Sequence, residues 1–599
     1  MKEHRRKTLE SALRDPFLVS QDTHSLQKLA KIFSKSKLSP EMRSTDTRVA
    51  LCGGFMTKFL VEILPLFFLQ RGITPTFYES EYGSFQQDII NNESELSRFD
   101  PELVIFFPTH RDLRFPPPTD ASNSMVENCL GREVDFWINL LKNLDAPTVL
   151  FTFDPPPTRR LGEADGLKPG GFLNYIRSVN TRLACNAPEH IKLIDTEQLC
   201  ASVGETLWHD QRLYHMAKQP MSMDALPIIA NSIAASASAI LGKSRKVLVL
   251  DLDNTLWGGT IGDDGLDGIT LGPETSDGES FLAFQEYLKS LSERGIVLAV
   301  CSKNSEKIAL QPFREHGAMV LQESDFPVFV ANYKDKATNI REIAKTLNVG
   351  LDSVVFADDS PVECALVRKQ LPEVWVVELS GDPSEFIRRL DHFIPFPVAS
   401  LTEEDFARSA SYQSLNTVHS ELQKTTDIEA FLRDLKPVAI LEHVRDDTVE
   451  RMSQLIAKTN QYKLNPTTFS TSELRKRSSD VLAFRLKDSL QDYGIVSVIV
   501  TEPDYDSDAL ILRNWVMSCR VFSRRLEFFI REKIAETAAE KGLSILRLEY
   551  LQSGRNDLIC DLLPTLGFSR SKMPNWFEAD TKSPENLPSH FIALEEAPS

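Results

Sequence analysis

The stretch KVLVLDLDNTLWGG, Lys246 to Gly259, decides the fold of the chain around it. Its apolar run from Val247 to Leu250 is typical of a parallel strand buried on both faces. Asp251 and Asp253 follow where that run ends, and this spacing puts both carboxylates on one side of the strand end. In open α/β sheets, ligands bind beyond this carboxyl edge. The stretch therefore predicts a chemical site at the end of a buried strand.

Two neighbouring carboxylates repel each other unless a cation lies between them or one of them keeps its proton. A hard divalent ion such as Mg²⁺ would hold Asp251 ionised as a nucleophile toward phosphorus. A protonated Asp253 could serve the leaving group as a general acid. Thr255 follows at the same spacing. Acidic turns after strands are also common without a catalytic role, so D-x-D-x-T alone leaves both interpretations open.

Polar residues further along the chain complete this chemistry, most of them at the end of another apolar run. They are Ser302 after GIVLAV, Lys336 near the start of a helical stretch, and Asp358 and Asp359 after SVVFA. The hydroxyl of Ser302 and the ammonium of Lys336 suit phosphate oxygens, and the second acidic pair suits a metal ion. The residues together predict a phosphoryl-transfer site.

This order, Asp-x-Asp, Ser, Lys, Asp-Asp, resembles the haloacid dehalogenase superfamily of phosphotransferases. The resemblance implies that Asp251 is the nucleophile that becomes an aspartyl phosphate and that Asp253 is the acid/base. It also implies a phosphate-binding set of Thr255, Ser302 and Lys336. The implied Mg²⁺ ligands are Asp251, the backbone carbonyl of Asp253, and Asp358, with Asp359 in support.

The amino-acid sequences of the motifs are closer still to one subfamily. The segments that carry this likeness are DLDNTLWGGTIGDDG, CSKN, NYKDKATNI, VVFADDSPVE, KTNQYKLN and MSCRV. They resemble the FkbH-like enzymes, also called subfamily IIIC phosphatases, over nearly the whole chain. The family is known for taking the glyceryl group of 1,3-bisphosphoglycerate, removing phosphate, and loading the acyl group on a carrier protein. The resemblance implies this activity for polyketide or related biosynthesis.

Cys301 is a candidate for a covalent role in that transfer. A thiol near a lysine and a Mg²⁺ site could have a lowered pKa and could take the glyceryl group as a thioester. Cys519 in MSCRV is the rival acceptor. A buried small hydrophobe at a strand end is the alternative interpretation of Cys301.

Three function classes remain open from the sequence. The first is the acyl-loading enzyme with 1,3-bisphosphoglycerate and a phosphopantetheinylated acyl carrier protein as partners. The second is a free-standing Mg²⁺-dependent phosphatase for a small phosphorylated metabolite or sugar. The third is a non-catalytic assembly protein. The complete motifs from Asp251 to Asp359 argue against the third class, and an open site argues against the second.

At 599 residues the chain exceeds what one core normally holds, and alternating strands and helices predict three α/β domains. The predicted organisation is a helical extension over 1–46, an SGNH-hydrolase-like, flavodoxin-like doubly wound domain over 47–242, the catalytic domain over 243–398, a helical connector over 399–430, a GNAT-like domain over 431–572 and a tail over 573–599. The catalytic domain is expected to be Rossmannoid and to lack a large cap, because the chain between its motifs is too short for one.

The first domain is similar to SGNH hydrolases, whose serine nucleophile would follow the first strand. The turn from Gly53 to Thr57 contains no serine, and its hydroxyl residue, Thr57, is predicted to be a helix N-cap. His209, Asp210 and His215 are therefore predicted to be structural or surface groups. This domain is expected to shape or cover the catalytic site rather than to hydrolyse a substrate.

The GNAT-like domain lacks the glycine-bearing loop that such folds use for acetyl-CoA, since the corresponding stretch is CRVFSRRLE. Recognition of a carrier protein's phosphopantetheine arm is a reasonable second use. Carrier proteins are usually acidic, so their docking face should be locally basic. The candidate basic runs are 243–246, 475–477 and 520–525.

Composition excludes several other classes of protein. A formal net charge of −18 argues against general nucleic-acid binding. The N-terminal residues lack an apolar signal region, and the longest early apolar stretch is too short to span a bilayer, so a cytoplasmic protein without membrane partners is expected. The eight cysteines contain no C-x-x-C pair and are expected to be reduced thiols.

Overall fold

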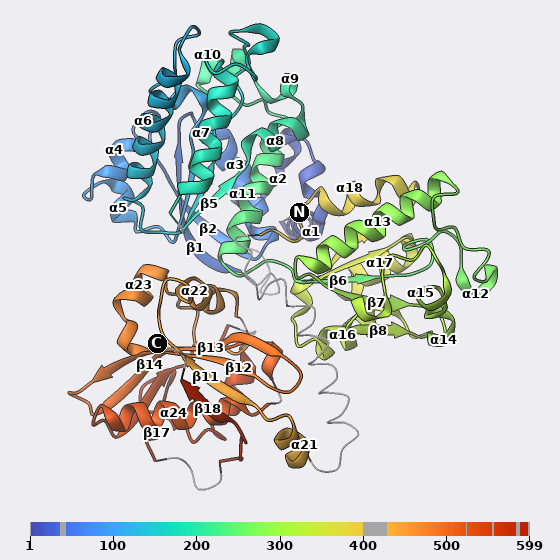
Figure 1. The fold of residues 1–599 in the computed structure, drawn as a ribbon, viewed down its shortest axis with the longest axis vertical. Helices are drawn as coiled ribbons and strands as arrows, with labels where there is room; N and C mark the ends of the chain where they lie inside the picture. Colours follow the sequence, from blue (N-terminus) through green and yellow to red (C-terminus); the bar gives the residue numbers. More distant parts are fainter. Residues whose placement is uncertain are drawn as a thin grey trace. The chain divides into compact units, whose positions relative to one another are not determined.

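The computed structural model describes residues 2–35, 44–188, 190–398, 428–459, 461–522, 524–553, 556–582 and 587–596. The chain divides into two compact units, Met1–Ser244 with Asp391–Ser400, and Arg245–Leu390 with Leu401–Ser599. Three sheets confirm the predicted α/β class (Figure 1). Most of the predicted connector, up to residue 427, lies outside the described residues. Among the described residues, every helix is too short or too polar to span a bilayer.

The first sheet is wholly parallel, in the order β2-β1-β3-β4-β5. Its strands are β1 (Thr45–Gly53), β2 (Ile73–Glu79), β3 (Leu103–Phe107), β4 (Thr148–Phe151) and β5 (Ile191–Ile194). Every residue of β3 is buried, because helices cover both faces of the sheet. The helices α3 (Lys58–Gln70) and α11 (Leu226–Ile240) pack on each other, as do α6 (Asn123–Leu141) and α7 (Phe172–Asn186). This is the predicted doubly wound fold.

The remaining helices of this unit are α1 (Lys2–Arg14), α2 (Thr23–Phe33), α4 (Phe85–Ile90), α5 (Glu95–Phe99), α8 (Thr196–Val203), α9 (Glu205–Trp208) and α10 (Gln211–Ala217). Helices α1 and α2 pack against α3 and bury Leu9 and Leu26 completely. The predicted N-terminal extension therefore contributes to the hydrophobic core of the first unit.

The catalytic sheet is also wholly parallel, in the order β10-β9-β6-β7-β8. Its strands are β6 (Val247–Leu250), β7 (Val297–Ser302), β8 (Val328–Ala331), β9 (Val354–Asp358) and β10 (Trp375–Glu378). Its helices are α12 (Ile261–Asp264), α13 (Ser276–Glu293), α14 (Glu306–Ala309), α15 (Gln311–Glu315), α16 (Lys336–Thr346), α17 (Pro361–Gln370) and α18 (Phe386–Asp391). The segments between the catalytic motifs are short, and no separate cap domain interrupts the fully described range 190–398.

The third sheet is mixed, in the order β16-β17-β15-β14-β13-β12-β11-β18. Its strands are β11 (Val438–Glu442), β12 (Val481–Lys487), β13 (Asp492–Asp504), β14 (Ala509–Met517), β15 (Ile545–Glu549), β16 (Ser569–Arg570), β17 (Trp576–Asp580) and β18 (Ala593–Glu596). Its helices are α21 (Ile428–Asp434), α22 (Val449–Lys458), α23 (Thr471–Lys476), α24 (Leu526–Glu540) and α25 (Asp557–Leu562). The prediction of a tail from residue 573 is wrong, because β17 and β18 continue the sheet. Phe577 in β17 and Ile592 just before β18 are buried.

Candidate active site

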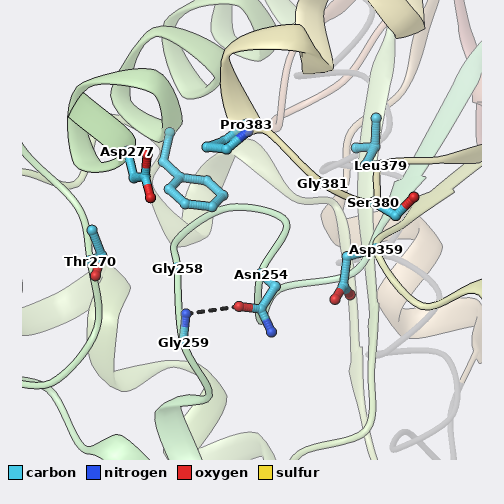
Figure 2. A pocket seen from close by; sticks show the side chains of 11 residues that line it. Asn254, Gly258, Gly259, Thr270, Asp277, Asp359, Leu379, Ser380, Gly381 and Pro383 are labelled. Atoms are coloured by element: carbon cyan, nitrogen blue, oxygen red, sulfur yellow. Dashed lines mark hydrogen bonds between the residues drawn. The ribbon is translucent and has the colours of Figure 1, made fainter.

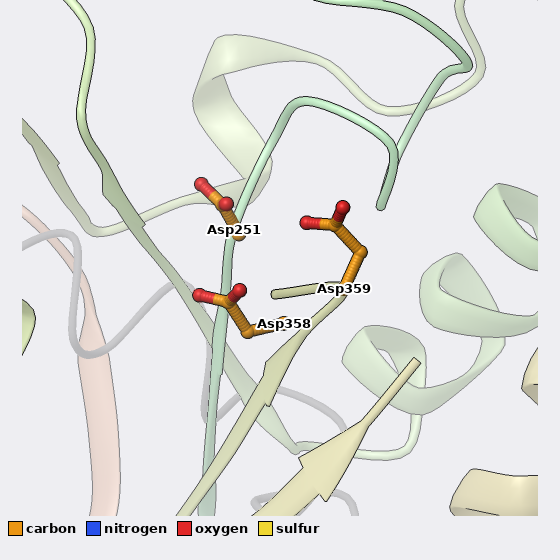
Figure 3. Close-up of side chains that lie close together, drawn as sticks. All are labelled: Asp251, Asp358 and Asp359. Atoms are coloured by element: carbon orange, nitrogen blue, oxygen red, sulfur yellow. The ribbon is translucent and has the colours of Figure 1, made fainter. Parts of the chain in front are cut away.

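Parallel pairing of β6 with β9 brings the two acidic pairs together. Leu250 pairs with Ala357, so Asp251 and Asp358 leave neighbouring strands at the same edge of the sheet. Oxygen atoms of Asp251, Asp358 and Asp359 all lie within 4.8 Å of one another. Figure 3 shows the three carboxylates gathered at the ends of these strands. The structure thus joins residues that are more than one hundred positions apart in the chain.

Lys336 is the counter-ion of this cluster. It stands at the start of α16, after the N-cap Asp335, and its side chain is only 3% exposed. Its Nζ donates to Asp251 Oδ2 at 2.7 Å and to Asp358 Oδ2 at 2.5 Å. Burial opposes the ammonium charge, but the two carboxylates outweigh burial and raise the pKa of Lys336. Lys336 is therefore a permanent cation in the site.

Asp253 is held by three donors that the sequence did not reveal. Its Oδ1 accepts from the indole Nε1 of Trp257 at 3.1 Å and from the backbone N of Ile261 at 3.0 Å. Its Oδ2 accepts from Asn304 Nδ2 at 2.8 Å, and the same amide lies 3.3 Å from Ser302 Oγ. Trp257 and Asn304 occur inside the DLDNTLWGG and CSKN motifs, so their place in those motifs was the available signal. Asn304 links the Asp253 carboxylate with the Ser302 hydroxyl.

The residues present fit a magnesium ion. Asp251 Oδ1 is buried and has no hydrogen-bond partner among the described residues, although Oδ2 of the same carboxylate is fully engaged. Carboxylate oxygens are the ligands that Mg²⁺ prefers. The acidic cluster consists of Asp251, Asp358 and Asp359. The side chain of Asp253 is not part of it, and the predicted role of its backbone carbonyl stays a prediction.

Ser302 and Thr255 are also buried at this edge of the sheet. Ser302 is 1% exposed at the end of β7, and Thr255 is fully buried with an Oγ1 that lacks a partner in the described part of the chain. Both hydroxyls accompany the predicted nucleophile, so the geometry is compatible with the predicted phosphate-binding set. Their contact with a phosphoryl group stays a prediction.

The structure contradicts the prediction of an activated thiol at Cys301. Its side chain is fully buried and packs with Val249, Ala337 and Ile340 on one face of the sheet. Its Sγ lies 3.9 Å from the backbone oxygen of Lys336, on the opposite side of β7 from the neighbouring Ser302. Burial, which outweighs the attraction of the Lys336 ammonium, raises the pKa of Cys301 to about 12. Cys301 is a core residue, and its burial disfavours the thiolate.

We expect Cys301→Ala to leave phosphate release at the wild-type rate and to lower the free energy of unfolding by about 1 kcal/mol, the cost of a small core cavity. Phosphate release and thermal unfolding of the full chain measure the two effects. A large loss of rate in a variant with wild-type stability would restore a chemical role for the thiol.

We expect Trp257→Phe to slow phosphate release about tenfold with little change in KM, because the variant keeps an aromatic ring in the core but loses one donor to Asp253. The ring packs edge-on against Phe313, with centroids 5.8 Å apart, and phenylalanine preserves part of that contact. The pH–rate profile should shift as well, since Trp257 acts through the Asp253 carboxylate. An unchanged profile together with an unchanged rate would show that this hydrogen bond is dispensable.

The second acidic pair predicts a pH-dependent response to metal. Burial and the charge of Asp251 raise the pKa of both Asp358 and Asp359 to about 6. Because these folded-state pKa values lie above the ordinary value, the folded protein binds protons more tightly than the unfolded chain. The contribution of the Asp358 and Asp359 carboxyl groups to the free energy of unfolding therefore falls as pH rises from about 4 through about 6. Above that range these groups destabilise the folded protein to their full extent. Mg²⁺ requires the ionised forms and offsets this repulsion.

We accordingly expect Mg²⁺ to raise the melting temperature of the full chain more at pH 7.5 than at pH 5. Thermal unfolding in EDTA and in excess Mg²⁺ at both pH values measures the difference. An equal increase at the two pH values would contradict the assignment of these carboxylates as the metal site.

A cavity of 540 Å³ opens beside Asp359. Figure 2 shows Asn254 and the Gly258–Gly259 turn on one side and Ser380, Gly381 and Pro383 on the other. The Gly259 N–H donates to Asn254 Oδ1 at 2.9 Å, which fixes the turn after Trp257. Most of the lining residues are small or polar, Phe281 and Leu379 add an apolar side, and none is basic. The cavity suits a small hydroxylated substrate next to the acidic cluster.

The N-terminal unit contains a separate buried polar cluster. His110 Nδ1 lies 2.9 Å from Asp154 Oδ1, and His209 Nε2 lies 2.9 Å from the backbone oxygen of Pro155. The side chain of His209 is 5% exposed, and its association with His110 and Asp154 was missed. Thr57 occupies the N-cap position of α3, yet its side chain does not cap the helix and instead donates to Glu79 Oε2 at 2.8 Å.

Most of the predicted basic docking runs are already engaged within the protein. Arg475 and Arg477 form ion pairs with Asp446 and Glu502. Arg520 is buried, Arg524 forms a buried ion pair with Asp488, and Arg245 donates to backbone oxygens and stacks on Trp375. These runs offer few cations to a partner.

Two comparisons with known proteins indicate the family of this chain. A family model described as the N-terminal domain of FkbH matches residues 48–235. The N-terminal part of the Bacteroides fragilis protein BF1531, a solved structure containing a phosphatase domain complexed with Mg, is 30% identical to this chain. That match covers 64% of this chain and 100% of the other, with a TM-score of 0.57.

The chain belongs to the FkbH-like family. This FkbH-like protein accordingly carries a catalytic domain of the haloacid dehalogenase phosphatase type. The similar solved structures also include a GNAT-family acetyltransferase from Staphylococcus aureus, at 11% identity over 24% of this chain and 100% of the other, with a TM-score of 0.20. The GNAT domain of a protein from S. lividans matches at 14% identity over 23% of this chain and 89% of the other, with a TM-score of 0.19. No curated protein matches the FkbH-like chain.

Proposed function

We propose that this FkbH-like protein takes the glyceryl group of 1,3-bisphosphoglycerate, removes phosphate, and loads the glyceryl unit as a thioester on an acyl carrier protein. The observation that supports the phosphatase part is the position of Asp251. Its Oδ2 is fixed by Lys336, and its Oδ1 is buried without a partner among the described residues. Hydrogen bonds orient Asp253 two residues away. Family membership supports the transfer to a carrier.

Asp251 is the nucleophile in this proposal. One of its carboxylate oxygens attacks phosphorus, the bond between phosphorus and the substrate oxygen breaks, and the substrate oxygen takes a proton from Asp253. Water then hydrolyses the aspartyl phosphate while Asp253 accepts the proton. Lys336 neutralises charge on the phosphoryl group throughout. Asp251, Asp358 and Asp359 would hold Mg²⁺, which supplies further charge neutralisation when it is bound.

The donor carries an acyl phosphate on carbon 1 and a phosphate ester on carbon 3. Thioester formation requires that the acyl phosphate stay intact until the carrier thiol attacks. Attack at the phosphorus of the acyl phosphate on carbon 1 would release a free carboxylate, and no thioester could follow. We therefore assign Asp251 to the phosphate ester on carbon 3. The carrier thiol attacks carbon 1, where a carbon–sulfur bond forms and the carbon–oxygen bond to phosphate breaks.

The carrier thiol is proposed to attack directly. Cys301 is buried on the far side of β7 from Ser302 and cannot reach the edge of the sheet where the aspartates meet. Without a cap domain, the site is open to a macromolecular acceptor. Direct transfer needs no protein thiol.

A free-standing phosphatase is the second candidate, and the 540 Å³ cavity beside Asp359 favours it because a small metabolite fits there without a carrier. One assay separates the candidates. The protein is incubated with 1,3-bisphosphoglycerate and Mg²⁺, with or without phosphopantetheinylated carrier; released phosphate is measured and the carrier is weighed by intact mass spectrometry. The proposal expects a glyceryl mass on the carrier. Phosphate release with an unmodified carrier would favour the free phosphatase, and neither product would favour a non-catalytic protein.

A further inference from the structure

An exposed surface with basic and aromatic side chains lies at the carboxyl edge of the N-terminal sheet. It is formed by the loops after β1, β2 and β3 together with α10, and we call it the Tyr214 patch. Its members are the exposed Met56, Tyr82 and Met216 and the half-buried Arg111, Tyr214 and Lys218. The carboxyl edge is where open parallel sheets bind their ligands, so this position favours recognition.

Two cations face one aromatic ring in this patch. The guanidinium carbon of Arg111 lies 4.1 Å from the ring centroid of Tyr214, and Nζ of Lys218 lies 5.0 Å from it. Lys218 ends α10 in the left-handed conformation, and its backbone oxygen accepts from the N–H of Met56 at 3.0 Å. The loop after β1 and the end of α10 are thereby joined. The cations are held in place by the fold.

These cations have no counter-ion in the part of the chain that the structure describes. Neither Arg111 nor Lys218 forms an ion pair there, and Nη1 of Arg111 is buried without a hydrogen-bond partner. A partner with negative charge would satisfy them.

The carboxylate that follows Arg111 in the sequence is engaged within its own loop. Oδ2 of Asp112 accepts from the backbone N and the Oγ1 of Thr109, at 2.7 and 3.0 Å. The same carboxylate fills the space beside Gly54, where an added Cβ would lie 1.9 Å from Asp112 Oδ2. Asp112 is thus hydrogen-bonded within its own loop. Among the described residues it forms no ion pair with the neighbouring Arg111 guanidinium.

The same loops and α10 also carry exposed apolar and aromatic side chains. Met56 is 39% exposed, Tyr82 is 46% exposed and Met216 is 73% exposed. Tyrosine, arginine and methionine are the residue types that protein interfaces enrich, and arginine and tyrosine supply many of their energetic hot spots. The combination fits the surface of a protein better than a small anion, which would not need exposed methionines.

We propose that the Tyr214 patch docks a protein with an acidic surface, which under the proposed function is the acyl carrier protein. Carboxylates of the partner pair with Arg111 and Lys218, and an apolar side chain of the partner covers Met56 and Met216. The identity of the partner rests on the proposed function, whereas the acidic character follows from the patch. The basic face expected for the carrier is therefore assigned to the N-terminal unit.

The test uses the full chain with Arg111→Gln and Lys218→Gln combined, and a phosphopantetheinylated type II acyl carrier protein as the probe. We expect the affinity for the carrier and the KM for carrier in the loading assay to weaken about tenfold, with a smaller salt dependence of binding. Phosphate release from a small phosphate ester should stay unchanged. The matched control is Arg182→Gln, an exposed arginine of the same unit that pairs with Glu127, and it should bind like the wild type.

The outcomes separate the two proposals. Wild-type affinity in the double variant, or no binding of the carrier by the wild-type chain, would overturn the docking surface. Binding that depends on Arg111 and Lys218 without any glyceryl mass on the carrier would support the docking surface and reject the loading function. A folded double variant is verified by its unchanged melting temperature.

Discussion

Asp251→Asn should reduce phosphate release by several orders of magnitude while the protein stays folded. The substitution removes the nucleophile and one carboxylate of the acidic cluster but preserves the shape of the side chain. It also leaves Lys336 with a neutral partner in place of one of its two carboxylates. Release of phosphate under saturating substrate and Mg²⁺ measures the loss, and thermal unfolding verifies the fold.

Asp263→Asn is the matched control, because Asp263 is an exposed carboxylate on α12 outside the acidic cluster. This variant should retain the wild-type rate. If Asp251→Asn also retained most of the activity, the assignment of the catalytic site would fail entirely, and with it the proposed function.

Lys336→Met should both inactivate and destabilise the protein. The lysine is 3% exposed and bridges Asp251 and Asp358, so its loss leaves two carboxylates at the sheet edge without their cation. Breaking a buried ion pair in this way costs about 3–5 kcal/mol. Thermal unfolding in EDTA should show the full loss. Mg²⁺ should restore more stability to the variant than it adds to the wild type, because the ion supplies the missing positive charge.

The control for this variant is Lys289→Met, which removes an equally short ion pair, 2.7 Å to Asp325, from a lysine side chain that is 35% exposed. Surface pairs contribute about 0–1 kcal/mol, so this variant should unfold close to the wild type. Equal effects of the two substitutions would show that Lys336 does not stabilise an acidic cluster.

The strands and their polar ends could be predicted because short apolar runs and the residues that follow them are local features. Asp251 and Asp358 meet because β6 and β9 are neighbours, as the predicted fold requires. The donors to Asp253 could not be predicted, since the positions of Trp257 and Asn304 depend on two loops that pack together in space. The same applies to His110 and Asp154, which come from different strand ends.

The error at Cys301 has a simple physical origin. Side chains alternate along a strand, so if Ser302 faces the site at the end of β7, Cys301 must face the helix layer. The packing of Cys301 with Ala337 and Ile340 follows from that alternation. Cys301 was assigned a role because it is next to Ser302 in the sequence. The alternation of side chains along the strand makes these two residues point to opposite faces of the sheet.

The close approach of Asp112 to Gly54 bears on which side chains this turn can accept. A Cβ at Gly54 would lie 1.9 Å from Asp112 Oδ2, so a serine there would require the Asp112 carboxylate to move. That movement would disturb the hydrogen bonds that Asp112 accepts from Thr109. The residue at position 54 is therefore coupled to the order of the loop after β3.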